Sequence, residues 1–164
     1  MTGAPIRRLI GITLLAASGW SCSPSAPMCY TARLMEYGSN GLDAHVYASS
    51  QNALSTYRSR LQEFGSDGLD SHLFASSQYS LGTYRSRLGE YGSDGLDSHI
   101  YASAPHSLAK YRARLAEFGG GGLDAHRYAF AGHSLPAFKN RLSEYGSGGL
   151  DAYYFASSPH ALCR

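Results

Sequence analysis

Hydrophobic residues recur at helical spacing in the segment ALSTYRSRLQEFG, residues 53–65. Leu54, Tyr57, Leu61 and Phe64 are three, four and three positions apart, which places them on one face of an α-helix, with the polar residues between them mostly outside. Gly65 follows, where a helix C-terminus favours a left-handed residue. The pattern predicts an amphipathic helix that ends at this glycine.

A second kind of segment, GLDAHVYAS at residues 41–49, is centred on aromatic and β-branched residues between glycine-rich stretches. This composition is typical of a strand. In a strand Leu42, Ala44, Val46 and Ala48 would share one face. A short second helix that begins near the aspartate is the alternative.

Both segments recur with a period of 27 residues and no insertion or deletion. The phrase R-L-x-E-[YF]-G begins at Arg33, Arg60, Arg87, Arg114 and Arg141. The phrase G-L-D-[AS]-[HY] begins at Gly41, Gly68, Gly95, Gly122 and Gly149. A fixed period of this length indicates a repeat architecture. We divide the chain into a signal peptide (1–21), an N-terminal cap segment (22–29) and five repeats (30–56, 57–83, 84–110, 111–137 and 138–164).

The fold class expected from these units is α/β, a tandem-repeat solenoid of five strand-helix units. Parallel strands lie about 4.8 Å apart and helices about 10 Å apart, so such an array curves with its helices on the convex side. In this interpretation the leucine at the start of each strand belongs to the core. These leucines are Leu42, Leu69, Leu96, Leu123 and Leu150. The alternative second helix would instead give an all-α hairpin solenoid.

The first 21 residues have the layout of a secretory signal peptide. Arg7 and Arg8 precede the apolar stretch LIGITLLAASGW, which is too short to span a bilayer. We expect the protein to be secreted or displayed on the cell surface. The alternative is lipid anchoring through Cys22, which directly follows the apolar stretch.

The charge balance argues against nucleic acid as a partner. The chain has 14 Lys+Arg and 12 Asp+Glu, but residues 1–21 hold two arginines and no acid, so the remainder carries 12 residues of each sign. No basic block remains to neutralise phosphates. Lys110 and Lys139 are the only lysines, so there is no polybasic membrane patch. We also expect no transmembrane span in the mature form.

Aspartate, histidine and aromatic residues recur at fixed positions and would form ladders on one concave sheet face. The candidate ligand ladder is Asp43, His45, Tyr47, Asp70, His72, Phe74, Asp97, His99, Tyr101, Asp124, His126 and Tyr128. Such a face suits a glycan or an extended peptide. Histidine and carboxylate groups can also bind a metal ion, but capping of turns by the aspartates and stacking of the histidines explain the same spacing without one. We expect no metal site, no cofactor and no enzyme, because every repeat offers the same polar groups rather than distinct residues around one point.

Cys29 and Cys163 lie at consecutive positions of the repeat, outside its regular phrases. An exported protein would hold them in an oxidising compartment, where disulfides persist. If the tail of one molecule meets the head of another in register, the two cysteines become neighbours. We therefore expect a structural protein that assembles head to tail into a surface or extracellular filament or matrix. Two alternatives remain: a closed ring locked by the same pair, and a periplasmic or cell-surface binding module that uses the ladder face.

Overall fold

The computed structural model describes residues 29–146 and 148–163, so the signal peptide, Cys22 and most of the cap segment lie outside the described residues. This part of the chain forms helices and no strand. The helices are α1 (Tyr30–Tyr37), α2 (Leu42–Ser49), α3 (Leu54–Phe64), α4 (Leu69–Ser76), α5 (Leu81–Tyr91), α6 (Leu96–Ser103), α7 (Leu108–Phe118), α8 (Leu123–Phe130), α9 (Leu135–Tyr145) and α10 (Leu150–Ser157). The prediction of strand-helix units is wrong, and the all-α hairpin alternative describes the repeat.

The odd-numbered helices are the amphipathic helices that the spacing predicts. Each ends at a glycine with positive φ, between 81° and 90°. These glycines are Gly38, Gly65, Gly92, Gly119 and Gly146. In α9, Pro136 lies in the first turn, where its missing N–H costs no helical hydrogen bond. The prediction for this half of the repeat is confirmed.

The even-numbered helices occupy the segments that we expected to be strands. In α2 the extended residue Gly41 precedes the helix, Asp43 lies in its positively polarised first turn, and the amide of His45 donates to the carbonyl of Gly41 at 3.3 Å. Burial extends around most of the helix, because Ala44, Val46, Tyr47, Ala48 and Ser49 are all buried. A helix buried around most of its circumference shows little 3.6-residue alternation, which is why its sequence pattern did not distinguish it from a strand.

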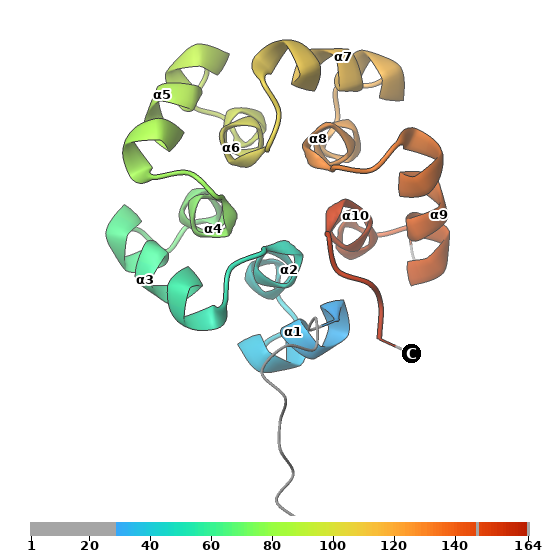
Figure 1. The fold of residues 1–164 in the computed structure, drawn as a ribbon, viewed down its shortest axis with the longest axis horizontal. Helices are drawn as coiled ribbons and strands as arrows, with labels where there is room; N and C mark the ends of the chain where they lie inside the picture. The colour runs from blue at the N-terminus through green and yellow to red at the C-terminus, as the bar shows by residue number, and fades with distance from the viewer. Residues whose placement is uncertain (1–28, 147, 164) are drawn as a thin grey trace, which may run out of the picture.

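The ten helices form two concentric rings (Figure 1). The even-numbered helices stand around a common centre and are seen end-on, while the odd-numbered helices lie across their outer side. Each inner helix packs on the next, and α10 packs on α2 in the same way as α2 packs on α4. The repeat array is therefore a closed ring rather than an open solenoid.

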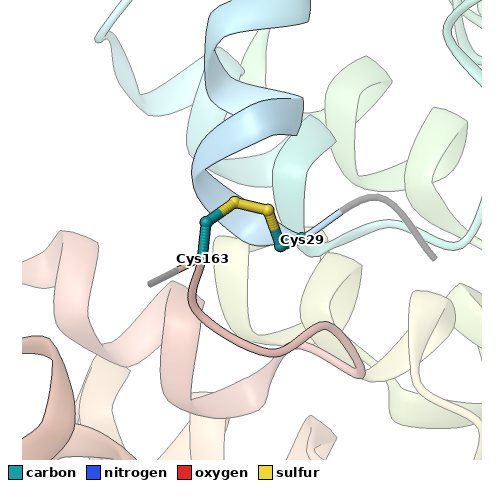
Figure 2. Close-up of a disulfide and its surroundings, with 2 residues drawn as sticks. All are labelled: Cys29 and Cys163. Atoms are coloured by element: carbon teal, nitrogen blue, oxygen red, sulfur yellow. A yellow bond between two sulfur atoms is a disulfide. The ribbon is translucent and has the colours of Figure 1, made fainter. Parts of the chain in front are cut away.

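The ring closes where the C-terminal tail meets α1. The amide of Tyr30 donates to the carbonyl of Ala161 at 2.9 Å, which reproduces the bond from Tyr57 to Ala53 at the start of α3. The C-terminal tail thus occupies the position that the first turn of the outer helix takes in the other repeats. Cys29, at the start of α1, and Cys163, in the tail, form a disulfide with a Cα–Cα distance of 5.3 Å (Figure 2). The register that we expected between two molecules is realised within one chain.

The leucines at the start of the inner helices are not all core residues, which corrects the sequence-based prediction. Leu96 and Leu150 are 38% and 36% exposed, because these helix ends face solvent on one side of the ring. The buried centre instead comes from residues four positions later, such as Leu73 and Ile100.

Candidate functional site

The predicted ladder histidines are tied to the outer helices. In each of the first four repeats a tyrosine hydroxyl lies 2.8–2.9 Å from the histidine Nδ1. The pairs are Tyr30–His45, Tyr57–His72, Tyr84–His99 and Tyr111–His126. The fifth repeat has Phe138 beside Tyr153, so both partners change together. Burial lowers the pKa of these histidines.

The ladder aromatics are covered by the arginine of the R-L-x-E phrase. The Arg33 Cζ atom lies 4.3 Å from the ring centroid of Tyr47, and its Nη2 donates to the carbonyl oxygens of Tyr47 and Asn52. The equivalent arginines Arg60, Arg87, Arg114 and Arg141 repeat this arrangement over Phe74, Tyr101, Tyr128 and Phe155. The arginine therefore fixes the loop after each inner helix.

The ladder does not form a single binding face. The aromatic rings are buried between the two layers, with Tyr47, Phe74, Tyr101 and Tyr128 at 0% exposure. The aspartates lie in the first turns of the inner helices, where a negative charge complements the helix N-terminus. The described residues contain no group of three or more His, Cys, Asp or Glu side chains suited to hold a metal ion. These residues build the repeat.

A pocket of about 190 Å³ opens at the centre of the ring, at the C-terminal ends of the inner helices. We name it the axial pocket. The last residue of each inner helix lines it: Ser49, Ser76, Ser103, Phe130 and Ser157. The residues two positions further on form its rim: Gln51, Gln78, Pro105, Gly132 and Pro159. Asn52 and His133 complete the lining.

The axial pocket has two chemically different sides, although the repeats that build it are similar. Gln51, Asn52 and Gln78 supply amides from the first two repeats. Phe130 stands where the other repeats have serine, and Gly132 stands where they have glutamine or proline. Phe130 and Gly132 make the opposite side apolar. The serine hydroxyls donate to carbonyl oxygens three residues earlier, at 2.8–3.0 Å. The pocket is therefore suited to an asymmetric ligand with one polar side.

Arg127 lies behind the pocket wall. Its position in the repeat is held by Val46, Leu73, Ile100 and, in the last repeat, Tyr154. Arg127 is only 1% exposed. Its Cζ atom lies 4.0 Å from the ring centroid of Tyr154 and 4.7 Å from that of Phe130, and its Nη2 donates to Ser157 Oγ.

The end of α8 and two aromatic rings stabilise the positive charge of Arg127, whereas burial opposes it. Burial lowers the pKa of Arg127, and the phenol of Tyr154 opposes this shift. Arg127 lies in the last turn of α8, where the helix dipole favours a positive charge. The faces of Phe130 and Tyr154 add cation–π attraction.

Sequence reasoning missed the axial pocket and Arg127. The signal was present, because R-Y-A-F in the fourth repeat replaces an aliphatic residue and a serine that the first three repeats keep. This replacement can be interpreted only when it is known that positions 127 and 130 lie toward the ring centre. The strand interpretation did not place them there.

A second hollow lies on the opposite side of the ring, beside the start of α6 and α8. It has a volume of about 230 Å³ and is lined by Leu96, Asp97, Ile100, Gly121, Leu123 and His126. It is open to solvent and involves only neighbouring repeats. We therefore take the axial pocket as the candidate functional site.

Comparison with known proteins does not assign a family: no family model, no curated protein and no solved structure matches this chain. Among the described residues, no helix has both the length and the apolar character needed to cross a membrane. Function is therefore argued from the geometry of the ring.

Proposed function

We propose that this chain is an exported, ring-shaped binding module that holds a small ligand in the axial pocket. The observation that carries the proposal is that all five repeats contribute to one pocket, and that Phe130, which lines it, replaces the serine that the other four repeats keep. Concave sites with an apolar wall and a few polar groups are typical of small-molecule binding.

The size of the pocket limits the ligand. A volume of about 190 Å³ is below that of the usual site for a drug-sized molecule, so it suits a compact ligand such as a single ring with one substituent. The Asn52 amide nitrogen already donates to the carbonyl oxygens of Ala75 and Ser77. The amides of Gln51 and Gln78 offer hydrogen bonds, while Phe130 and Pro105 offer apolar contact. This favours a small molecule over the extended glycan or peptide that a long concave face would hold.

Binding is a better interpretation than catalysis for this pocket. The residues lining it include one imidazole, His133, and no carboxylate or thiol. His133 lies 2.9 Å from the carbonyl oxygen of Ser158 through Nε2, which makes this atom a donor. General acid–base chemistry needs paired groups in distinct roles, and the lining does not bring such a pair together.

Head-to-tail assembly into a filament stays a prediction, and so do a glycan or cell-surface partner and anchoring through Cys22. The two cysteines that suggested assembly are joined within one ring, so assembly would have to use the faces or the outer helices. The disulfide itself supports export, because such bonds persist in oxidising compartments.

A fragment screen tests the proposal. Thermal unfolding of the oxidised chain would be recorded with a library of compact ring compounds, and hits would be repeated with Gly132→Gln and Gly89→Gln. Gly132→Gln places in the rim the side chain that Gln51 and Gln78 already have, and an added Cβ meets no atom within 4 Å. Gly89→Gln makes the same change on exposed α5, where the equivalent residue of α3 is Gln62.

Ligands of the axial pocket should raise Tm for the original chain and for Gly89→Gln, but much less for Gly132→Gln. A screen without hits, or hits that Gly132→Gln leaves unchanged, would refute a small-ligand role for this pocket. Sedimentation of the same samples would separately show any large assembly.

A further inference from the structure

We infer that Arg127 is the anchor for a carboxylate group on the ligand of the axial pocket. This inference rests on the proposed function and adds the chemical class of the ligand. It concerns one side chain that the repeat does not require, since Leu73 and Ile100 fill the same place at the ring centre.

Arg127 is a buried cation whose donors are incompletely used. The residue is 1% exposed, its Nε has no hydrogen-bond partner, and its Nη2 donates to the neutral hydroxyl of Ser157. Tyr154 Oη, on the ring beside the guanidinium, also lacks a hydrogen-bond partner. The Nε atoms of Arg33 and Arg60 also lack a partner, but the Nη2 atom of each donates to two backbone carbonyl oxygens. Buried charges in proteins are normally paired and fully hydrogen-bonded, so the single neutral acceptor at Arg127 and the unpartnered Tyr154 Oη beside it point to a missing acceptor.

The geometry of Arg127 favours a carboxylate as that acceptor. The aromatic rings of Tyr154 and Phe130 interact with the guanidinium through its π face, whereas its N–H groups lie in the guanidinium plane. A carboxylate presents two oxygens in one plane and binds arginine through two parallel hydrogen bonds. Such a bond satisfies the donors and neutralises the charge in one step.

The axial pocket provides the route to Arg127. Phe130 and Ser157 contact the guanidinium and also line the pocket. Ser157 Oγ accepts from Arg127 and donates to the carbonyl oxygen of Tyr154. A carboxylate oxygen that takes over the acceptor role of Ser157 Oγ leaves the bond from Ser157 to Tyr154 in place, so the wall needs only a small adjustment.

The same surroundings limit the charge of the ligand. The five inner helices all direct their C-terminal ends, which carry partial negative charge, at the pocket. One positive charge on Arg127 can offset one carboxylate, but a second negative charge would face the helix ends without compensation. The ligand class is therefore a compact monocarboxylate with an uncharged body, rather than a phosphate or a dicarboxylate.

The test compares benzoate with benzamide, which have the same ring and differ in charge. Affinities for the oxidised chain would be measured by titration calorimetry at neutral pH, and the titrations would be repeated with Arg127→Leu. Phthalate, a dianion on the same ring, would be titrated as a third probe. We expect benzoate to bind at least about tenfold more tightly than benzamide and more tightly than phthalate. In Arg127→Leu the preference for benzoate should disappear while weak binding of benzamide remains.

A second measurement uses the unchanged protein and does not depend on the folding of the variant. The Nε–H signal of Arg127 in a ¹⁵N spectrum should shift when benzoate is added and stay in place with benzamide. Equal affinity for both probes, an unmoved Nε–H signal, or binding of neither probe would overturn the carboxylate anchor. The proposed function would survive that result if neutral fragments from the screen still lose binding in Gly132→Gln.

Discussion

The Nε2 atom of His160 lies 2.7 Å from the carbonyl oxygen of Ser50, although the two residues are 110 positions apart in the chain. His133 makes the equivalent contact with Ser158, at 2.9 Å and a separation of 25 residues. The bond that links neighbouring repeats therefore also links the last repeat to the first. Together with the disulfide, it makes the seam of the ring resemble the other interfaces between repeats.

Cys163→Ser should leave a monomeric ring that is less stable by about 3–5 kcal/mol. The disulfide closes a loop with a sequence separation of 134, and the chain-entropy model gives large stabilisation for long loops. The packing of α10 on α2 and the bond from His160 to Ser50 should still hold the ends together. Urea unfolding with and without reductant measures the difference, and reductant should destabilise only the original chain. If the original chain ran on a non-reducing gel as a ladder of disulfide-linked oligomers, the disulfide would join different molecules, and closure within one chain would be contradicted.

Arg114→Lys should destabilise the fold by about 2–3 kcal/mol. Arg114 donates to the carbonyl oxygens of Tyr128, at 2.9 Å, and His133, at 2.6 Å, while its guanidinium stacks on Tyr128. Lysine cannot reproduce the fork or the stacking, so a carbonyl would lose its partner. Arg112→Lys, on the exposed side of α7, is the matched control and should change the free energy of unfolding by less than about 0.5 kcal/mol. Equal effects of the two changes would show that Arg114 does not hold the loop.

The protein should lose stability as the pH falls below about 6.5, the ordinary pKa of histidine. Burial lowers the pKa of six histidines: His45, His72, His99, His106, His126 and His160. The unfolded chain therefore takes up protons at a higher pH than the folded chain, so this contribution is complete above about pH 6.5 and is lost on acidification. Urea unfolding at several pH values measures the slope.

A transplanted pair separates the histidine contribution from that of the carboxylates. Tyr84→Phe with His99→Tyr gives the third repeat the pair that Phe138 and Tyr153 form in the fifth. This double variant should fold and show a shallower loss of stability between about pH 6.5 and 5. An unchanged slope would mean that the Tyr84–His99 contact contributes nothing to the acid sensitivity.

Ile100→Ala should cost about 2–4 kcal/mol, whereas Leu96→Ala should cost about 1 kcal/mol or less. Ile100 is fully buried at the ring centre, and its truncation leaves a cavity. Leu96 is 38% exposed at the start of the same helix, so solvent can reach the vacated space. Chemical denaturation of both variants measures the two losses. A larger loss for Leu96→Ala would mean that α6 is rotated so that Leu96, rather than Ile100, is buried at the ring centre.

The sequence alone determined the period, the five repeats, the outer helices with their terminal glycines, and the pairing of Cys29 with Cys163. These features depend on local signals, because the spacing of Leu54, Tyr57, Leu61 and Phe64 and the φ required of Gly65 act within a few residues. The pairing of Cys29 with Cys163 follows from their consecutive positions in the repeat. A strict period makes them neighbours whether the two ends belong to one molecule or to two.

Only the tertiary structure decided that the second segment is a helix, that the array closes, and that Arg127 lies behind the wall of an axial pocket. An inner helix touches two neighbours, its own outer helix and the ring centre, so burial around most of its circumference weakened the periodicity that identifies a helix. Closure depends on the curvature accumulated over all five repeats, to which each repeat adds only a part. The replacement of an aliphatic residue by Arg127 gains chemical meaning only when Phe130, Tyr154 and Ser157 come together around it, and the packing of α10 on α8 brings them there.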